Sequence, residues 1–486
     1  MGQIAPVFGA VIPSQAQQTL ANNYLNFAQG GANDFAQQYL PEIYEQEVER
    51  YGNRTLNGFL RMVGAEMPMT SDQVVWSEQN RLHISYNNVN LTGPGAGTFV
   101  LNLPTNGGTI QNAVAPNDTI VVMNPLTGIT IKGIVGAVAA GAGTTTNVTA
   151  YPFTLANWDT LGIANAGLKL FVYGSLFAKG TTSGAFSVQP QFTQFNNQPI
   201  IIKDRYQING SDMAQIGWVE VATEDGTSGY LWYLKSESET RLRFDDYLEM
   251  AMIEGELAAA GGGFTANGAA VPGFTAAAGA SVAHGTQGLF AAIQARGNVM
   301  AGFSGGTGIS DFDQVLKNLD TQGAIEENML FLNRSTDLDF DDMLGQLSAG
   351  FSGGVAYGLF ENSQDMALNL GFSGFRRGSY DFYKTSWKYL NDASTRGAVA
   401  VNNIDGVLIP AGTSTVYDQI LGTNIRRPFL HVRYRASQAD DRRYKNWITG
   451  TAGGAYTSEL DSMIVNWLSE RCLVTQAANN FVLFQA

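Results

Sequence analysis

Residues 227–260 constrain the fold most, because they predict a single long helix. They read TSGYLWYLKSESETRLRFDDYLEMAMIEGELAAA and contain no proline. Glu237 and Glu239 each precede an arginine by four residues, the favourable order for pairing on a helix surface. Two apolar edges have helical spacing. Leu231, Leu234 and Leu242 form one, and Phe244, Leu248, Ala251, Met252 and Gly255 form the other. The glycine run 261–263 predicts the end of the helix, which would span ~45–50 Å. Such a helix suits the spine of an elongated subunit better than the centre of a compact enzyme.

Composition narrows the function classes. Charged residues make up 14% of the chain, glycines number 56 and the net charge is −14. An uncharged polar surface suits packing against further copies, because little charge must be desolvated. Overall acidity argues against tight wrapping by nucleic acid. The single Cys472 excludes an internal disulfide and fits a reducing cytoplasm. We expect no signal peptide, since no basic residue precedes Arg50, and no apolar run approaches the ~20 residues that span a bilayer.

The first half of the chain changes from helical to strand periodicity. Residues 1–64 predict an N-terminal arm with narrow apolar stripes, which docks on something else. Strands are then expected at Gln73–Glu78, Arg81–Tyr86, Thr119–Met123, Ile129–Val135, Thr146–Thr149, Leu168–Tyr173, Gln189–Phe195 and Gln198–Lys203. Because strand character resumes after residue 190, we interpret residues 92–190 as a small β domain. It is inserted into a hairpin formed by 65–91 and 191–215.

The second half alternates helix and strand, which predicts an α+β fold. Helices are expected at Asp311–Leu319, Asp337–Leu347 and Glu459–Val474. The last of these rests on Leu460, Ile464, Leu468 and Cys472, which share one face at helical spacing. Strands are expected at Asn328–Asn333, Met366–Leu370, Tyr380–Lys384, Gly406–Pro410, Phe429–Arg435 and Phe481–Phe484.

Catalytic and metal sites are disfavoured, and no cofactor is predicted. Three histidines without paired spacing and one cysteine do not make a metal site. The run Asp337, Asp339, Asp341 and Asp342 lacks the glycine and glutamate of a calcium loop. We interpret it as a solvated helix start that favours the helix dipole. Two G-x-S-x-G matches surround Ser304 and Ser352, with His431 as a nominal base, but recurrence of Gly-Phe-Ser-Gly at Gly371 favours a compositional origin.

Pairs of adjacent arginines are more informative than the catalytic and metal-site patterns. Between Arg376 and Lys445 there are twelve basic and six acidic residues, whereas the rest of the chain is strongly acidic. Bidentate arginine–carboxylate contacts fix register between partners, so these pairs predict contacts between neighbouring copies. Ordinary surface arginines on strands, or arginines facing enclosed DNA, are the open alternatives. The candidate residues are Arg376, Arg377, Arg426, Arg427, Arg442, Arg443, Asp245, Asp246, Glu326 and Glu327.

The order of parts resembles the major capsid protein of tailed bacteriophages with the Hong Kong 97-type fold, and within it the crAss-like phages. Three segments carry the resemblance: Gly371–Tyr383 (GFSGFRRGSYDFY), Gly406–Gly412 (GVLIPAG) and Ser458–Ala486. It implies an N-terminal arm, an extended loop at 65–91 and 191–215, and a spine helix at 227–260. It further implies a peripheral domain at 216–300 and 370–440. The axial domain with the C-terminal elements would comprise 301–369 and 441–486.

The resemblance implies a non-enzymatic structural protein. Its copies would assemble into hexamers and pentamers of an icosahedral shell around double-stranded DNA, in the virion capsid after assembly in the host cytoplasm. The implied partners are further copies, a portal, auxiliary or decoration proteins, and packaged DNA by weak contact, with no membrane. A tail-tube or host-surface-binding virion protein is the alternative, and a serine hydrolase is a more distant one. Glycine-, Asn- and Gln-rich β segments also fit the tail-tube alternative.

Overall fold

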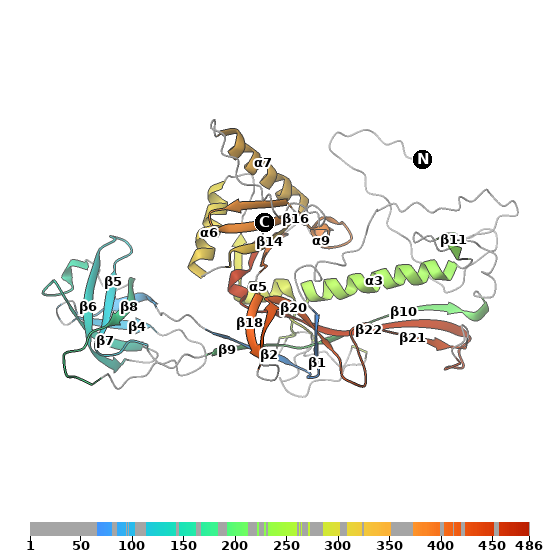
Figure 1. Ribbon diagram of the computed structural model, residues 1–486, viewed down its shortest axis with the longest axis horizontal. Helices are drawn as coiled ribbons and strands as arrows, with labels where there is room; N and C mark the ends of the chain where they lie inside the picture. Colours follow the sequence, from blue (N-terminus) through green and yellow to red (C-terminus); the bar gives the residue numbers. More distant parts are fainter. Residues whose placement is uncertain are drawn as a thin grey trace. The chain divides into compact units, whose positions relative to one another are not determined.

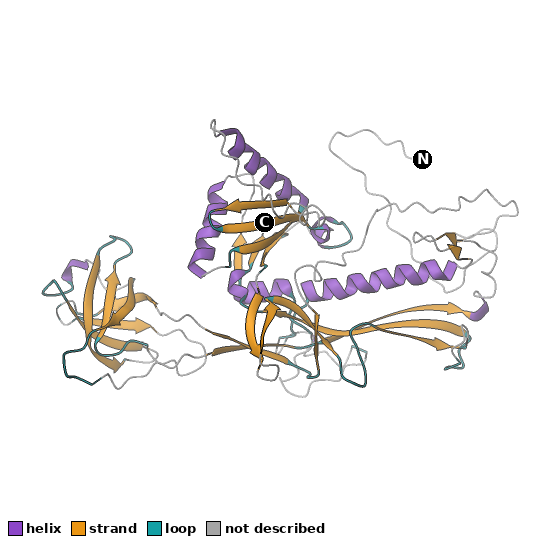
Figure 2. Cartoon of the chain, viewed as in Figure 1, coloured by secondary structure: helices purple, strands orange, loops and turns teal. Residues whose placement is uncertain are grey.

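A computed structural model of the chain describes two compact units, one from residues 77–195 and the other from the described residues on either side. Both are dominated by β-sheet, with few helices (Figures 1 and 2). Among the described helices, none is long and apolar enough to cross a membrane. The described residues are 66–79, 85–93, 95, 97–102, 113–141, 145–161, 167–182, 192–211, 221–222, 228–229, 232–259, 262, 264, 271–272, 285–301, 309–322, 325–350, 373–398, 403–411, 413–418, 423–451 and 456–485.

The first unit is a closed six-stranded barrel with the strand order β3-β4-β7-β6-β5-β8 (Figure 1). Its strands are β3 (Ser85–Leu91), β4 (Thr98–Asn102), β5 (Asp118–Met123), β6 (Thr130–Ala140), β7 (Thr145–Pro152) and β8 (Leu168–Ser175). Trp158, just before η1 (Asp159–Leu161), fills the interior and donates its indole N–H to the carbonyl of Ala150 at 2.8 Å. Gly97 lies against this ring at φ +62°, where a Cβ atom would be 2.8 Å from the indole nitrogen.

Four strands predicted from alternation in the inserted domain are confirmed as β5 to β8. The compact unit is wider than the predicted insert of 92–190, because β3 also belongs to the barrel and not to the extended loop. β2 (Val74–Gln79) and β9 (Phe192–Asn197) pair in a two-stranded sheet. β2 and β9 thus pair on either side of the inserted chain, whereas β1, β3 and β10 from the predicted hairpin pair with other strands.

The second unit contains a five-stranded sheet built around a very long strand. Its order is β1-β20-β22-β10, with β21 pairing along β22 as well. The strands are β1 (Glu66–Met69), β10 (Ile200–Asn209), β20 (Leu430–Arg435), β21 (Lys445–Gly450) and β22 (Ser462–Thr475). β22 holds β10 along one side, and β21 followed by β20 along the other.

The prediction of a helix at 459–474 was wrong, because this segment is β22. A spacing of four residues is even, so Ile464, Leu468 and Cys472 also share one face of a strand. Met463, Val465 and Trp467 are apolar on the other face. A strand that is buried on both faces cannot be distinguished from a helix by periodicity alone.

The spine helix is shorter than predicted. α3 runs over Trp232–Glu254, not 227–260, and residues 255–259 are not helical. It ends at Gly255, where a Cβ atom would lie 2.7 Å from the Thr286 carbonyl oxygen, and the Gly288 N–H donates to the Gly255 carbonyl at 2.7 Å. The segment before α5 (Leu289–Arg296) thus crosses the helix end closely, and the glycine run at 261–263 is not the terminator.

α3 packs on one face of the β10–β22 ribbon. Phe244 and Leu248 are buried against Val465 and Trp467. Towards its end, Met252 and Ile253 join a second core shared with α5 and the other sheet. The predicted apolar edge that contains Phe244, Leu248 and Met252 is therefore buried. Leu242, on the other predicted edge, is 41% exposed.

A six-stranded mixed sheet with the order β13-β23-β17-β14-β16-β15 forms the rest of the unit. Two of its strands, β14 and β16, are labelled in Figure 1. Its strands are β13 (Asn298–Ala301), β14 (Glu327–Leu332), β15 (Ser373–Arg377), β16 (Tyr380–Ser386), β17 (Ile404–Pro410) and β23 (Val482–Gln485). α6 (Ile309–Gln322) and α7 (Arg334–Gly350) cover one face through Phe312 and Phe340, packed on Leu330. Phe331 points to the opposite face, into the core shared with α5. The predicted helices and the predicted strands at β14, β16, β17 and β23 are confirmed here.

Short elements complete the unit: β11 (Val221–Ala222) with β12 (Ser228–Gly229), β18 (Thr413–Asp418) with β19 (Thr423–Pro428), α9 (Lys388–Asn391), η5 (Arg396–Ala398) and η6 (Ala478–Asn480). The predicted division into peripheral and axial domains stays a prediction, and the sheets show which strands lie together. β15 to β17, from the segment 370–440, join α6 and α7, whereas β21 and β22, from 441–486, lie with α3. The arm at 1–64 and the strand at Met366–Leu370 lie outside the described residues.

Candidate functional site

The arginine pair Arg376 and Arg377 lies on β15 and has acidic partners within the chain. Arg377 donates from Nε and Nη2 to both carboxylate oxygens of Asp313 on α6, at 2.9 and 2.8 Å. Arg376 lies across the β15–β16 hairpin from Asp381, with Nε 3.4 Å from the carboxylate and the side chain 56% exposed. The forked contact joins a helix to the sheet edge, and Arg376 is the more accessible of the two.

Arg442 and Arg443 belong to a cluster on the five-stranded sheet, which we call the sheet cluster: Glu66, Arg435, Arg442, Arg443, Glu470 and Arg471. The two oxygens of Glu470 each face an arginine, Arg442 Nε at 2.6 Å and Arg435 Nε at 3.1 Å. Glu66 on β1 likewise lies between Arg443 Nε at 2.5 Å and Arg471 Nη1 at 3.5 Å. The cluster fastens β1, β20 and the loop before β21 to the middle of β22.

Arg471 is the buried member of the sheet cluster, with 7% of its surface exposed. It donates to Ser469 Oγ at 2.9 Å and to the carbonyl of Arg443 at 3.0 Å. Burial lowers the pKa of Arg471, and the charges of Glu66 and then Glu249 oppose this. Because a buried charge without a partner is costly, the carboxylates of Glu66 and Glu249 stabilise the buried guanidinium group of Arg471.

Asp245 on α3 lies near the sheet cluster, beside Tyr444. Burial, and then the negative charge of Asp245, raise the pKa of Tyr444 to about 12. The ring of Tyr444 meets Phe244 edge-on, with centroids 5.5 Å apart. Asp246 follows on α3 and is half-buried. The structure thus places one predicted acidic residue, Asp245, near enough to Arg471 of the sheet cluster for its charge to oppose the lowering of the Arg471 pKa.

Arg426 and Arg427 lie on β19, opposite Thr415 and Ser414 of β18. Their backbone is described, and their side chains lie outside the described part. Glu326 and Glu327 are exposed at the start of β14. Their carbonyl oxygens accept hydrogen bonds from Asp381 and Ala411. The structure does not bring these four residues together.

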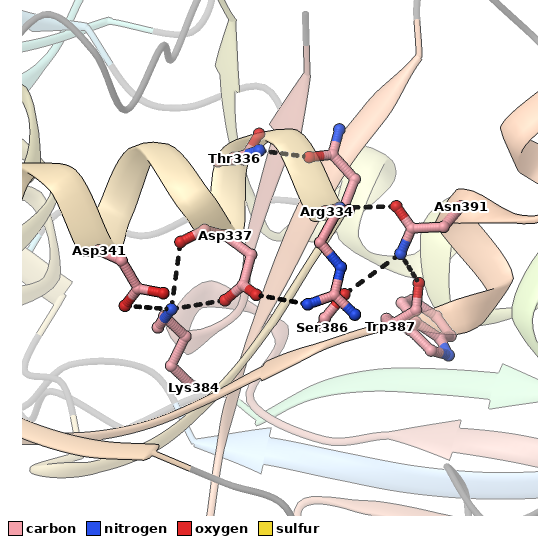
Figure 3. Close-up of polar contacts among 9 residues, drawn as sticks. Arg334, Thr336, Asp337, Asp341, Lys384, Ser386, Trp387 and Asn391 are labelled. Carbon is pink, nitrogen blue, oxygen red and sulfur yellow. Dashed lines mark hydrogen bonds and ion pairs between the residues drawn. The ribbon is translucent and has the colours of Figure 1, made fainter. Parts of the chain in front are cut away.

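A second charged group, the lysine cluster, joins α7 to the six-stranded sheet (Figure 3). Lys384 on β16 is 3% exposed. Its Nζ atom contacts the carboxylates of Asp337 at 2.5 Å and Asp341 at 2.8 Å, and the Asp337 carbonyl at 3.1 Å. The interpretation of this run as a solvated helix start is therefore wrong for Asp337, which is 7% exposed. Asp337 still lies in the first turn of α7, where the dipole favours a carboxylate.

Neighbouring polar contacts fix the start of α7 (Figure 3). The Thr336 N–H donates to Asn333 Oδ1 at 2.7 Å, an N-cap contact. The Arg334 N–H donates to Asn391 Oδ1 at 2.6 Å, and Asn391 Nδ2 donates to the Trp387 carbonyl at 2.8 Å. The helix start is thereby held to the segment that follows β16.

A buried amide marks the point where the chain returns from the barrel. Asn197 Nδ2 donates to the carbonyls of Leu473 at 2.6 Å and Gln287 at 2.9 Å. Its Oδ1 accepts from the Gln287 N–H at 2.8 Å and the Gln198 N–H at 2.9 Å. One side chain therefore ties β9, β22 and the segment before α5 together.

Within the described residues, no group of His, Cys, Asp and Glu is arranged to hold a metal ion. Ser304 and Ser352 lie outside the described residues. His431 is 1% exposed on β20, with Nδ1 3.0 Å from the Pro428 carbonyl. The charged groups described above are paired and partly buried, an arrangement that holds elements in register.

Sequence reasoning missed Glu66, Lys384, Glu470, Arg471 and Asn197. The adjacent charges Glu470 and Arg471 lie in a mostly apolar segment, which is a usable signal for buried ion pairs once that segment is recognised as a strand. Lys384 shares one face of β16 with Phe382, and Tyr383 points to the other, but nothing in the local sequence shows which face is covered. Its burial depends on α7, which precedes it by several dozen residues.

Comparisons with known proteins give structural likeness only. No protein-family model matches the chain, and no curated protein matches it. Among solved structures, the chain is similar to one titled "Asymmetric unit of bacteriophage PhiM1 mature capsid", with 9% identity, TM-score 0.38 and 94% of each chain covered. A structure from Mycobacterium phage Ogopogo also gives 9% identity and TM-score 0.38, covering 93% of this chain and 96% of that one.

A third similar structure is titled "Capsid of native GTA particle computed with C5 symmetry". It gives 9% identity and TM-score 0.34, covering 92% of this chain and 95% of that chain. The structural neighbours are thus phage and capsid proteins, matched over nearly their whole length. At this identity and these TM-scores, the likeness by itself carries no functional conclusion.

Proposed function

We propose that this chain is a major capsid protein of the Hong Kong 97 type from a tailed phage, similar to the crAss-like group. Its copies form hexamers and pentamers of an icosahedral shell that encloses double-stranded DNA. A portal and auxiliary proteins complete this shell. The observation that carries the proposal is the sheet under α3, whose exposed apolar side chains and edge strand β10 are available to neighbouring copies.

Along each strand of this sheet, side chains that point towards α3 alternate with side chains that point to the opposite face. Asp204, Tyr206 and Ile208 of β10 pair with Trp467, Val465 and Met463 on the α3 side. The residues between them point the other way. On that side Ile201 is 52% exposed and Trp447 is 38% exposed. A two-layer arrangement normally buries such side chains, so this surface is complete only when something else covers it.

Among the described strands, β10 is the edge strand of the same sheet, and it pairs with β22 along its whole length. A long unpaired edge is a template for association unless a partner or a charged residue blocks it. Self-assembly supplies the partner, and each of many contacts contributes buried area.

The candidate arginines contribute to contacts between copies under this proposal. Arg376 keeps 56% of its side chain exposed while near Asp381. Arg426 and Arg427 lie on β19, and their side chains lie outside the described part. Glu326, Glu327 and Asp246 are the acidic candidates. Arg377, Arg442 and Arg443 already have carboxylate partners within the chain, so they hold the subunit's own register first.

Negative-stain microscopy and sedimentation of the purified protein test the proposal. Closed shells with five- and six-fold vertices are the expected result, and particles isolated from infected or DNA-packaging cells should protect DNA from nuclease. Open tubes would favour a tail-tube protein instead. A monomer at all concentrations would refute the proposal.

The arginine contacts have their own test. The double variant Arg426→Glu/Arg427→Glu should prevent or weaken shell formation, because like charges would face the acidic candidates. Lys317→Glu is the matched control, since Lys317 is exposed on α6 and lies outside the candidate set. Normal shells from the double variant would remove these two residues from the contact.

A further inference from the structure

The barrel carries an exposed aromatic face that the fold does not use. Leu170, Ile120, Ile131 and Val148 fill the interior, and the alternate residues point outward. On the outside, Tyr151 is 57%, Phe153 48%, Phe171 45% and Tyr173 51% exposed. We call these four residues the barrel face.

The barrel face spreads over the adjacent strands β8, β5, β6 and β7. The register places Phe171 opposite Val121, and Val121 opposite Lys132. The Phe153 N–H donates to the Lys132 carbonyl at 3.1 Å, so Phe153 is next in the same row. In the neighbouring row, Ile134 lies opposite Tyr151. The exposed rings are therefore separated by Val121, Lys132 and Ile134, and together these side chains form a mixed apolar and basic surface of a kind that marks interaction sites.

The charges of the barrel differ from those of the rest of the chain. Residues 77–195 contain four basic residues, Arg81, Lys132, Lys169 and Lys179, and three acidic ones, Glu78, Asp118 and Asp159. The net charge is +1 there, which leaves −15 for the remainder of a chain of net charge −14. Lys132 lies within the rows of the barrel face and Lys169 precedes Phe171 by two residues on the outside of β8; both are exposed.

We infer that the barrel face binds the acidic second unit of a neighbouring copy, with aromatic rings on apolar side chains and Lys132 against a carboxylate. This rests on the proposed self-assembly and names one contact within it. Charge complementarity favours the acidic second unit as the partner. If a second barrel were the partner, Lys132 and Lys169 of one copy would face Lys132 and Lys169 of the other and repel them. The acidic unit instead offers exposed carboxylates beside exposed apolar residues, as at Leu338 and Asp342 of α7.

The first test is assembly of a surface variant. Phe153→Ser/Phe171→Ser should raise the concentration for half-assembly about 10-fold or more, because exposed aromatic anchors dominate such contacts. Leu126→Ser is the matched control, since Leu126 is 89% exposed in the β5–β6 turn, outside the barrel face. Fluorescence of buried Trp158 reports whether the barrel is folded in each variant. Unchanged shell formation by a folded double variant would overturn the inference.

The second test identifies the partner surface. A zero-length carbodiimide joins a lysine amine to a carboxylate in contact, and mixing isotopically light and heavy chains separates links between copies from links within one. We expect Lys132 of one chain joined to an Asp or Glu outside residues 77–195 of another, with the link absent in Lys132→Arg. Links from Lys132 only to Glu78, Asp118 or Asp159 of a second barrel, or no link between chains, would overturn the inference. Failure of the wild-type chain to form shells would instead refute the proposed function and this contact with it.

Discussion

Replacing Lys384 by methionine should loosen α7 from the six-stranded sheet. The ammonium group is buried and contacts two carboxylates, Asp337 Oδ1 at 2.5 Å and Asp341 Oδ1 at 2.8 Å. Methionine fills a similar volume but leaves Asp337 buried without its main counter-charge. Arg334 is a weaker substitute, at 3.4 Å with 64% of its side chain exposed. Breaking a buried pair at one partner costs ~3–5 kcal/mol, and the helix dipole at Asp337 places this case near ~3 kcal/mol.

Hydrogen exchange over 334–342 and 380–386 measures the effect. A loss of ~3 kcal/mol in local opening free energy corresponds to roughly 100-fold faster exchange of the protected amides. Lys317→Met, the same change at an exposed position on α6, should leave exchange unchanged. Lys384→Met/Asp337→Leu should restore most of the protection, because an apolar pair of similar volume is often neutral. Equal acceleration in the single and double variants would refute the reasoning, since lost packing would then explain the effect without any unpaired charge.

Three further predictions follow from buried positions. Burial raises the pKa of the Cys472 thiol to about 12 from 9.0. The folding stability linked to this thiol is therefore fully present below pH ~9 and is lost between pH 9 and 12. Disulfide-exchange reagents should label the native chain at pH ~8 far more slowly than the unfolded chain. Gly255→Ala should lower the midpoint of thermal unfolding by an amount equivalent to ~1–3 kcal/mol, although alanine has the better helix propensity. The reason is that the new Cβ atom would lie 2.7 Å from the Thr286 carbonyl oxygen. An unchanged or higher midpoint would show that the segment at Thr286 moves away without cost. Asn197→Ala should cost ~2–4 kcal/mol in urea unfolding through its unsatisfied buried partners, whereas the neighbouring Gln198→Ala should cost little.

Alternation and helical spacing predicted most elements whose burial is one-sided. β5 to β8 follow from alternating residues between turns, and α6 follows from Phe312, Val315 and Leu319 at helical spacing. β22 could not be predicted in this way, because both of its faces are covered and its spacing fits either structure. The end of α3 at Gly255 depends on Gly288, more than thirty residues later, so no local signal contains it.

The candidate site was predicted less completely than the fold. Composition identified the arginine-rich region, and Arg377, Arg442 and Arg443 do make ion pairs. Their partners could not be predicted, because Asp313, Glu470 and Glu66 are brought close by sheet order and not by sequence separation. Whether other arginines join copies is a property of the assembly, which a single chain does not specify.

Each of the two large sheets contains a strand from the last part of the sequence, β22 in one and β23 in the other, and this has a consequence for biosynthesis. Residues 462–475 supply the central strand of one sheet, and residues 482–485 supply an inner strand of the other. During translation, β10 emerges from the ribosome some 250 residues before the strand that pairs with it. Neither sheet can close on a nascent chain that lacks these late strands, so both sheets form only after β22 and β23 have been synthesised.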